Sequence, residues 1–245
     1  MSPGAGSSPV DVMPLLKICG LRHPDQAVAV AGLGADAIGV IAVPGSARHL
    51  QADARPALFA AVRHAHPSCR RVLVVVDPPE QRLAELQPEA GHDVLQLHGS
   101  ESPERCAELR HRLGLEVWKA LRIRCPADLE AVAAYAPVVD ALLLDAWVPD
   151  QQGGSGQRIP LEWLVGFAPP LPWWLAGGLS AERLAEVLSC VQPDGLDLSS
   201  GVEDRPGEKN LERVAELIGV LRSVTGMLPA PTEQAGSRQS LRSRP

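Results

Sequence analysis

The feature that most constrains this chain is a series of eight short apolar runs along its middle. Their starts lie 22 to 34 residues apart, and the segments between them, such as PDQAVAVAGLG and SPERCAELRHRLG, have the pattern of amphipathic helices. Strands that alternate with helices at this spacing predict βα units and a parallel sheet. The runs are residues 15–19, 37–42, 71–76, 94–98, 116–123, 141–146, 173–178 and 195–200.

The regularity of these runs bears on the choice between two architectures. Eight βα units in about 211 residues, which is the chain of 245 without about 34 residues in its two flanks, match a near-minimal (β/α)8 TIM barrel with right-handed crossovers. A doubly wound open sheet could also hold eight strands, but the repeat shows no division into halves. Polar residues also alternate on one strand face, as Gln96 and His98 do and as Asp145 does with Leu143, which would point them into a barrel. We therefore predict a single-domain α/β barrel.

The predicted barrel occupies residues 14–223. Residues 1–13 are rich in Pro, Gly and Ser, and residues 224–245 show no hydrophobic period, so both ends are expected to be flexible, disordered extensions. Met13 stands directly before the first apolar run and is therefore a candidate for the true start of translation.

Capping residues mark individual helix boundaries. Ser102 or Pro103 is expected to begin one helix, and Gly32 and Gly114 are expected to end two others. Excess length after the second and sixth strands falls in residues 43–51 and 147–160. In α/β barrels the loops at these strand ends build the active site.

Composition argues against several classes of protein. The chain is 45% hydrophobic and 21% charged, with a net charge of −6, which is typical of soluble globular domains. The chain has no run of about 18 apolar residues, so no membrane span is predicted, and its first residues lack the basic and apolar regions of a signal peptide. A cytoplasmic location is therefore expected. The acidic balance gives no reason to expect a nucleic-acid partner.

No metal or cofactor is expected. The five cysteines are scattered without a CxxC pair, which argues against disulfides and against a thiolate zinc site. The seven histidines show no ligand spacing such as HExxH. Because no G-x-G-x-x-G follows the first strand, a dinucleotide is not expected either.

Candidate catalytic residues lie at the predicted strand ends and in the first long loop. Each also has a structural interpretation: Cys19 as a small buried apolar residue, Asp145 as a turn cap, His98 as a partner of the backbone and Arg48 as a solvated charge. The candidates are Cys19, His98, Asp145, Asp197, Ser199 and Ser200, with Arg48 in the loop.

Lys17 and Lys119 stand within apolar strands, so each must reach solvent or pair with an acid. A buried ion pair with a carboxylate inside the barrel is the favoured interpretation for both. Lys17 lies one inward layer below Cys19, and its charge would favour the thiolate there.

Three glycine-bearing segments are candidates for binding phosphate. AGGLS (176–180) and DLSSGVE (197–203) end the seventh and eighth strands, where α/β barrels commonly hold phosphate. Glycine lets backbone N–H groups approach an anion closely. GGSGQ (153–157), which contains Gly154, is less specific because it lacks the GK[ST] of a P-loop, and it could be only a flexible loop.

Taken in order, these segments resemble the phosphoribosylanthranilate isomerase family of tryptophan biosynthesis. The resemblance spans about residues 15–222, and every predicted strand end except the third contributes to it. The matching pieces are KICGL (17–21), GADAIGV (34–40), SARHL (46–50), QLHGSE (96–101), WKALRI (118–123), LLLDA (142–146), GGSG (153–156), LAGGLS (175–180) and DLSSGVEDRPGEKN (197–210).

The resemblance implies an α/β barrel without metal or cofactor that converts N-(5-phosphoribosyl)anthranilate into 1-(2-carboxyphenylamino)-1-deoxyribulose 5-phosphate. It places the general base on Cys19, the general acid on Asp145 and the partner of the anthranilate carboxylate on Arg48. His98 and Asp197 are expected as further substrate contacts. The implied phosphate site comprises Gly154, Gly177, Gly178, Ser199, Ser200 and Gly201.

Two segments depart from the family's usual pattern. Val40, Ile41 and SARH (46–49) stand where a Phe and SPRY are common, and Gln157 replaces a usual Lys. A histidine-pathway isomerase on the same barrel is an alternative, although that enzyme uses Asp where this chain has Cys19. A phosphate-binding barrel without catalysis is a second alternative. The expected partner is a phosphorylated small molecule, and both a monomer and a homodimer remain open.

Overall fold

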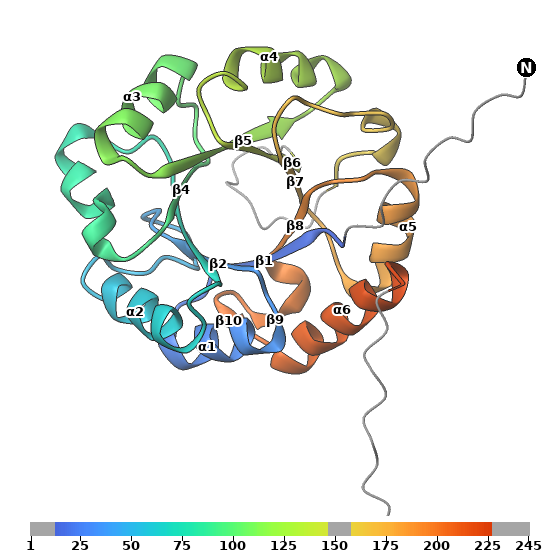
Figure 1. Ribbon diagram of the computed structural model, residues 1–245, viewed down its shortest axis with the longest axis horizontal. Helices are drawn as coiled ribbons and strands as arrows, with labels where there is room; N and C mark the ends of the chain where they lie inside the picture. Colours follow the sequence, from blue (N-terminus) through green and yellow to red (C-terminus); the bar gives the residue numbers. More distant parts are fainter. Residues whose placement is uncertain (1–12, 147–157, 227–245) are drawn as a thin grey trace, which may run out of the picture.

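Eight parallel strands form a closed barrel at the centre of the protein. The computed structural model describes residues 13–146 and 158–226. Each strand pairs with the next along the chain, and β8 closes the ring by pairing with β1 (Figure 1). The strands are β1 (Leu15–Cys19), β2 (Ala37–Ile41), β3 (Arg70–Val75), β4 (Val94–Leu97), β5 (Glu116–Ile123), β6 (Ala141–Ala146), β7 (Trp173–Ala176) and β8 (Gly195–Leu198). The predicted barrel is confirmed, and the open sheet is wrong.

The helical layer outside the barrel is less uniform than the repeat predicts. The chain between β3 and β4 forms only 3-10 turns, because Pro78, Pro79 and Pro88 divide it into short pieces. The α-helices are α1 (Pro24–Leu33), α2 (Arg55–Ala65), α3 (Pro103–Leu113), α4 (Val132–Tyr135), α5 (Leu184–Cys190) and α6 (Leu211–Val224). The 3-10 turns are η1 (Glu80–Leu86), η2 (Pro88–Ala90), η3 (Pro126–Ala131), η4 (Leu161–Trp163), η5 (Ala181–Arg183) and η6 (Ser200–Val202).

The predicted helix boundaries are correct except at one glycine. Ser102 caps α3, its hydroxyl accepting from the N–H of Arg105 at 3.3 Å, and Gly114 ends that helix with a φ of 61°. Gly32, however, lies inside α1, and Gly34 ends the helix with a φ of 112°. The left-handed turn lies two residues later than expected because Leu33 still has helical geometry.

Four aspartates fasten the barrel at the amino ends of its strands. Each directly precedes an even-numbered strand, and each carboxylate accepts the backbone N–H of a residue at or near the start of the preceding strand at 2.8 or 2.9 Å. The pattern divides the barrel into four paired units, β1 with β2 through β7 with β8. The pairs are Asp36 with Leu16, Asp93 with Arg71, Asp140 with Val117, and Asp194 with Trp173.

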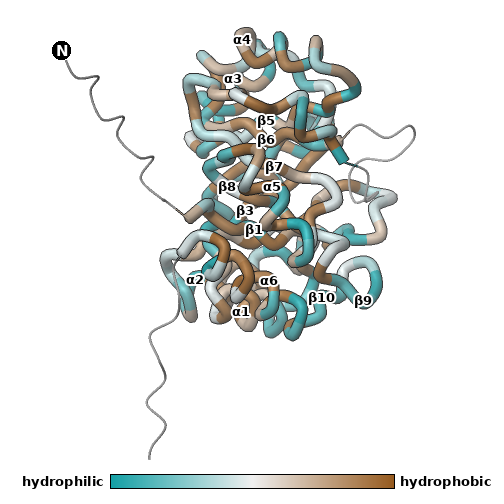
Figure 2. Tube along the Cα trace, turned by 90° about the vertical axis from the view of Figure 1, so that its right-hand side faces the viewer, coloured by the Kyte–Doolittle hydropathy of each residue, from teal (hydrophilic) through white to brown (hydrophobic). Residues whose placement is uncertain are grey.

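The interior of the barrel holds aromatic and small apolar side chains below a polar layer. Trp118 and Trp174 stack with ring centroids 4.7 Å apart, and Leu143 packs in the same cluster. Cys19 belongs to the upper part of this cluster. Figure 2 shows the apolar residues concentrated along the strands, with the hydrophilic hairpin of β9 (Glu203–Arg205) and β10 (Glu208–Lys209) at one end of the barrel.

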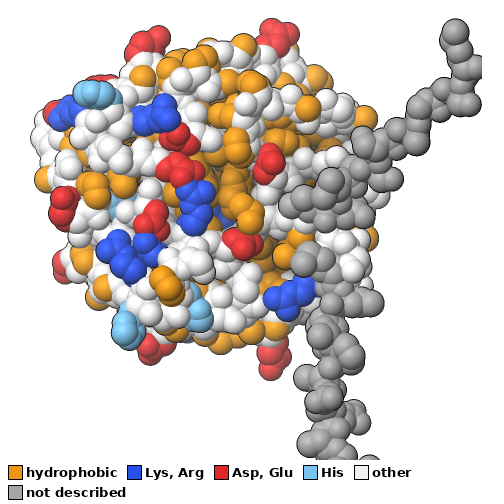
Figure 3. Space-filling view, viewed as in Figure 1, with side chains coloured by type: hydrophobic (Ala, Val, Ile, Leu, Met, Phe, Trp, Pro, Cys, Tyr) orange, Lys and Arg blue, Asp and Glu red, His pale blue; other side chains and the backbone are white. Residues whose placement is uncertain are grey.

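Two surface observations bear on possible partners. On the face drawn in Figure 3, basic side chains form small separate groups beside acidic ones, so this face presents no broad basic surface for nucleic acid. Within residues 13–146 and 158–226, no helix has both the length and the apolar character needed to cross a membrane.

Candidate active site

A cavity of about 590 Å³ opens at the carboxyl ends of the strands. That volume suits a small ligand, and the position is where α/β barrels carry their active sites. All the predicted site residues that the structure describes line this one cavity; Gly154 and Gln157 lie outside the described residues. The lining residues from the prediction are Cys19, Arg48, His98, Asp145, Gly177, Gly178, Asp197, Ser199, Ser200 and Gly201.

Cys19, at the end of β1, is buried beside a lysine–carboxylate pair. Lys17 lies two residues earlier on the same strand face, and its Nζ is 2.9 Å from Oδ1 of Asp197 on β8. Gly39 of β2 leaves room for this group, since a Cβ there would lie 2.7 Å from the Cys19 Sγ and 3.1 Å from the Lys17 Cε. The predicted ion pair inside the barrel is therefore present for Lys17.

The pKa of the Cys19 thiol is raised from its usual value, mainly because burial disfavours the thiolate. Lys17 opposes this effect, while the carboxylate of Asp197 adds to it. Burial also disfavours the charge on Lys17, but Asp197 and Cys19 together outweigh it, so the pKa of Lys17 is raised and its ammonium is retained. The expectation that the charge of Lys17 favours the thiolate of Cys19 agrees with the direction of its effect on the thiol, although burial keeps the pKa of the thiol above its usual value.

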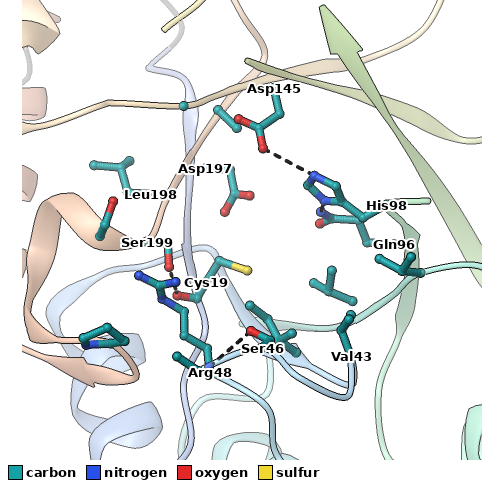
Figure 4. Close-up of a pocket in the computed structure, with 18 of the residues that line it drawn as sticks. Cys19, Val43, Ser46, Arg48, Gln96, His98, Asp145, Asp197, Leu198 and Ser199 are labelled. Carbon is teal, nitrogen blue, oxygen red and sulfur yellow. Dashed lines mark hydrogen bonds and ion pairs between the residues drawn. The ribbon is translucent and has the colours of Figure 1, made fainter. Parts of the chain in front are cut away.

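Asp145, at the end of β6, faces the same space from the other side of the ring. Its Oδ2 lies 3.3 Å from Nε2 of His98, and Nδ1 of His98 lies 3.0 Å from Nε2 of Gln96 (Figure 4). Because an amide nitrogen can only donate, this contact places the ring proton of neutral His98 on Nε2, toward Asp145. His98 thus contacts side chains, and the backbone interpretation of its ring is wrong.

Arg48 reaches the cavity from the loop after β2 and is not a solvated charge. Its side chain is 12% exposed, and its guanidinium forms a salt bridge with Glu203 of β9 at 2.7 Å. Glu203 also pairs with a second cation, since Lys209 Nζ lies 2.6 Å from Glu203 Oε1. Neither Glu203 nor Lys209 was identified from the sequence as a site residue.

Within residues 158–226, the predicted phosphate residues lie at the ends of β7 and β8, on the side of the cavity that adjoins Cys19. The hydroxyl of Ser199 donates to the carbonyl oxygen of Cys19 at 3.0 Å and accepts from Lys209 Nζ at 3.3 Å. The Ser199 side chain therefore joins β1 to β8 in this structure, and its contact with phosphate stays a prediction.

Lys119 and Val40 both lie on the outer face of the barrel sheet, and the inward interpretation of Lys119 is therefore wrong. Lys119 does not point into the barrel: its neighbours Trp118 and Ala120 do, and Lys119 pairs with Glu101 on the outer side of β5 at 2.7 Å. Of the two residues that stand where the family often has Phe, only Ile41 lines the cavity, whereas Val40 packs in the outer core. In both cases the inward-facing residue follows from strand parity with Trp118 or Ala37.

The chemistry of the site is that of proton transfer. The cavity joins a thiol and a carboxylate on opposite sides, a cation near the mouth and glycine-bearing turns on one side. Among the described residues, no group of three or more His, Cys, Asp or Glu side chains could hold a metal ion. The described residues can therefore supply an acid, a base and anion-binding groups.

The sequence matches the family model described as N-(5'phosphoribosyl)anthranilate (PRA) isomerase over residues 16–220. The chain belongs to this family. It is 43% identical over 218 residues to N-(5'-phosphoribosyl)anthranilate isomerase of Gloeobacter violaceus, covering 88% of this chain and 97% of that one. The corresponding Synechocystis protein is 45% identical over 208 residues, covering 82% and 93%.

Solved structures of PRA isomerases resemble this one over most of the chain. The Thermus thermophilus enzyme has a TM-score of 0.74 and 37% identity, covering 86% of this chain and 99% of that one. A PRA isomerase in complex with reduced 1-(o-carboxyphenylamino)-1-deoxyribulose 5-phosphate has a TM-score of 0.73 and 25% identity, covering 86% and 100%. The family resemblance drawn from the motifs is thereby confirmed.

Proposed function

We infer that this protein is an N-(5'-phosphoribosyl)anthranilate isomerase of tryptophan biosynthesis. It rearranges the aminoaldose N-(5'-phosphoribosyl)anthranilate to the aminoketose 1-(2-carboxyphenylamino)-1-deoxyribulose 5-phosphate. The observation that carries this function is the placement of Cys19 and Asp145 on opposite sides of one cavity, in a chain that matches the family model from residue 16 to residue 220. The roles of individual residues below are part of the proposal.

Asp145 is proposed to open the sugar ring as the general acid. Its proton passes to the ring oxygen as the bond from C1 to that oxygen breaks, and the anthranilate nitrogen lone pair forms an iminium at C1. The carboxylate that remains lies 3.3 Å from Nε2 of His98, whose ring is oriented by Gln96 and which would carry the compensating charge if protonated. His98 thus favours the form of Asp145 that exists after proton transfer.

Cys19 is proposed to remove the proton from C2 as the general base. The electron pair of that C–H bond forms the C1=C2 bond of an enolamine and neutralises the iminium nitrogen. Tautomerisation then moves the enol proton to C1 and leaves a ketone at C2, so no atoms are gained or lost. Lys17 lies beside the thiolate in this step and limits the cost of its burial.

Anionic groups of the substrate are proposed to bind at two ends of the cavity. Arg48 faces the anthranilate carboxylate, because it is the cation that lines the cavity on the side of β2. The phosphate lies against the turns after β7 and β8, where Gly177, Gly178 and Gly201 line the cavity. Asp197 borders the sugar between these two ends.

The test measures disappearance of anthranilate fluorescence from the substrate by the purified protein. Cys19→Ser and Asp145→Ala are each expected to lower kcat by about 10²- to 10⁴-fold, since each removes one positioned proton-transfer group. Cys190→Ser and Asp53→Ala, at exposed residues, are the matched controls and should retain full turnover. Undiminished turnover in both catalytic variants, or none in the native protein, would refute the proposal.

A further inference from the structure

The carboxylate of Glu203 is the centre of a buried charge cluster just outside the cavity. Its oxygens accept from Arg48 Nε at 3.0 and 3.1 Å and from Arg48 Nη2 at 2.7 Å. Lys209 Nζ and the backbone N–H of Gly207 donate to Oε1 at 2.6 and 3.1 Å. The β9–β10 hairpin therefore surrounds one carboxylate with two cations and an amide.

Arg48 lines the cavity, whereas Glu203 and Lys209 are not among the residues that line it. Glu203 uses the Nε and Nη2 edge of the guanidinium, which leaves the Nη1 group free of that contact. The stem of Arg48 lies across Gly20, whose φ is 86° and where a Cβ would be 2.6 Å from the Arg48 Cδ. The guanidinium is thus held along its stem by packing and along one edge by the acid.

The charges of the cluster favour an anion at Arg48. Two buried cations face one buried carboxylate, so the group keeps one unit of positive charge. Arg48 and Lys209 would repel each other at close range without Glu203. Arg48 has the shorter path to solvent, because it is 12% exposed and lines the cavity, whereas the Lys209 side chain is fully buried. Loss of the acid should therefore displace the arginine before it unfolds the hairpin.

The cluster also connects to the catalytic strand. Lys209 Nζ donates to the carbonyl oxygen and hydroxyl of Ser199 at 3.2 and 3.3 Å. The same hydroxyl donates to the carbonyl oxygen of Cys19 at 3.0 Å. The direction of Arg48 is thereby tied to the end of β1, on which the proposed base lies.

We propose that Glu203 is a specificity-determining positioning residue. It orients Arg48 so that the free edge of the guanidinium receives the carboxylate of the substrate's anthranilate group. The proposal rests on the isomerase function above. Glu203 acts through Arg48 and does not touch the substrate. A purely structural role for the hairpin anchor would instead affect every substrate and the fold alike.

The experiment compares two substrates that differ only in the carboxylate. One is N-(5-phosphoribosyl)anthranilate, and the other is N-(5-phosphoribosyl)aniline, made from ribose 5-phosphate and aniline. Glu203→Gln is expected to raise KM for the first by about 10-fold or more, the effect of one weakened charge-assisted contact, with kcat changed less than about threefold. KM and kcat for the second should stay within about twofold of the native values.

The matched control is Glu208→Gln on the other strand of the same hairpin. Glu208 is 41% exposed and pairs with the exposed Arg205 at 2.7 Å, so its variant should leave all four constants unchanged. In an Arg48→Ala background, Glu203→Gln should add less than about a twofold change, because the residue through which it acts is gone. Glu203→Asp, which keeps the charge but shortens the reach, serves if Glu203→Gln does not fold, and should show the same selective rise in KM.

Three outcomes would overturn the proposal. Glu203 variants could impair both substrates equally, or change kcat and not KM, as a general loss of structure would. The rise in KM caused by Glu203→Gln could also be as large in the Arg48→Ala background as in the native protein. A native protein inactive on both substrates would refute the isomerase function itself, and this proposal with it.

Discussion

Two buried lysines on the barrel strands have the same chemistry but lie on opposite faces of the sheet. Lys17 of β1 points inward and pairs with Asp197 at 2.9 Å, whereas Lys119 of β5 points outward and pairs with Glu101 at 2.7 Å. Both side chains are almost fully buried. The comparison separates what a buried ion pair does for the reaction from what it does for the fold.

The surroundings of the two acids explain the difference. Glu101 also accepts the backbone N–H groups of Asp77 and Gly99, at 2.7 and 2.9 Å, and Lys119 donates to the Gly99 carbonyl at 2.8 Å. This outer pair therefore fastens the loops that follow β3 and β4. The inner pair borders the cavity and the Cys19 thiol instead. The Lys17–Asp197 pair therefore affects the electrostatics of the site, and the Lys119–Glu101 pair stabilises the loops around it.

Breaking the inner pair is expected to have the largest effect. Lys17→Met leaves the Asp197 carboxylate buried without its cation, which should lower the free energy of unfolding by about 3–5 kcal/mol in urea denaturation at pH 7. It also removes the charge that opposes the raised pKa of Cys19. Alkylation of Cys19 by iodoacetamide should therefore require a higher pH in the variant than in the native protein.

The control for Lys17→Met is Arg205→Met, at a side chain that is 73% exposed. That variant should leave both the urea midpoint and the alkylation profile in place. An alkylation profile of Lys17→Met that matches the native one would show that Lys17 has no influence on the thiol, contrary to the electrostatic account of the inner pair.

His92 extends the comparison to a buried base that forms no ion pair within residues 13–146 and 158–226. Burial lowers the pKa of His92 from 6.5 to about 4. The unfolded chain binds a proton at this residue between pH 6.5 and about 4 and the folded chain does not. The contribution of His92 to the free energy of unfolding is therefore fully present above pH 6.5. It is lost as the pH falls toward 4, by about 3 kcal/mol in total.

Urea unfolding of native protein and His92→Leu between pH 7 and pH 4.5 measures this contribution. The variant should lose less stability than the native protein over that interval, while His64→Leu, at an exposed histidine, should follow the native curve. Parallel curves for all three proteins would show that His92 binds a proton in the folded state as readily as in the unfolded chain.

The sequence predicts an ion pair inside the barrel for both lysines. The inward direction is correct for Lys17, whose partner Asp197 the sequence does not identify, and wrong for Lys119, for a physical reason. On β1, Lys17 shares a face with Cys19, and period two then places both in the barrel. Both strands are buried on both faces, so apolar neighbours alone give no direction for either lysine. On β1 the candidate base Cys19 indicates the inward face, whereas on β5 no candidate site residue shares the face of Lys119. Only the position of Trp118 inside the barrel, known from the structure, resolves it.

The same limit applies to the acids. Cys19, Asp145 and Asp197 lie at the end of a barrel strand or one residue before it, and strand ends are visible as a break in an apolar run. Glu101 and Glu203 lie beyond the ends of the barrel strands, in segments without hydrophobic period, and Glu203 begins the short strand β9. Glu203 contacts Arg48 across 155 positions of the chain, a pairing that depends on closure of the barrel. The four aspartates before the even-numbered strands are a regular sequence feature of another kind, since each fastens two strands that are neighbours in sequence.

Breaking the outer pair should have the smallest effect of the three changes. Lys119→Met removes one donor from Glu101, but two backbone N–H groups remain on that carboxylate, so the expected loss is about 1.5–3 kcal/mol of unfolding free energy. The alkylation profile of Cys19 should match the native one, because Lys119 lies on the other face of the sheet.

Lys119→Met combined with Glu101→Gln should recover part of the lost stability, since the uncompensated charge is gone and an amide oxygen still accepts from the loops. A shift of the Cys19 profile in Lys119→Met as large as that in Lys17→Met would contradict the division by strand face, and a loss above that of Lys17→Met would show that the two amides do not shield the acid.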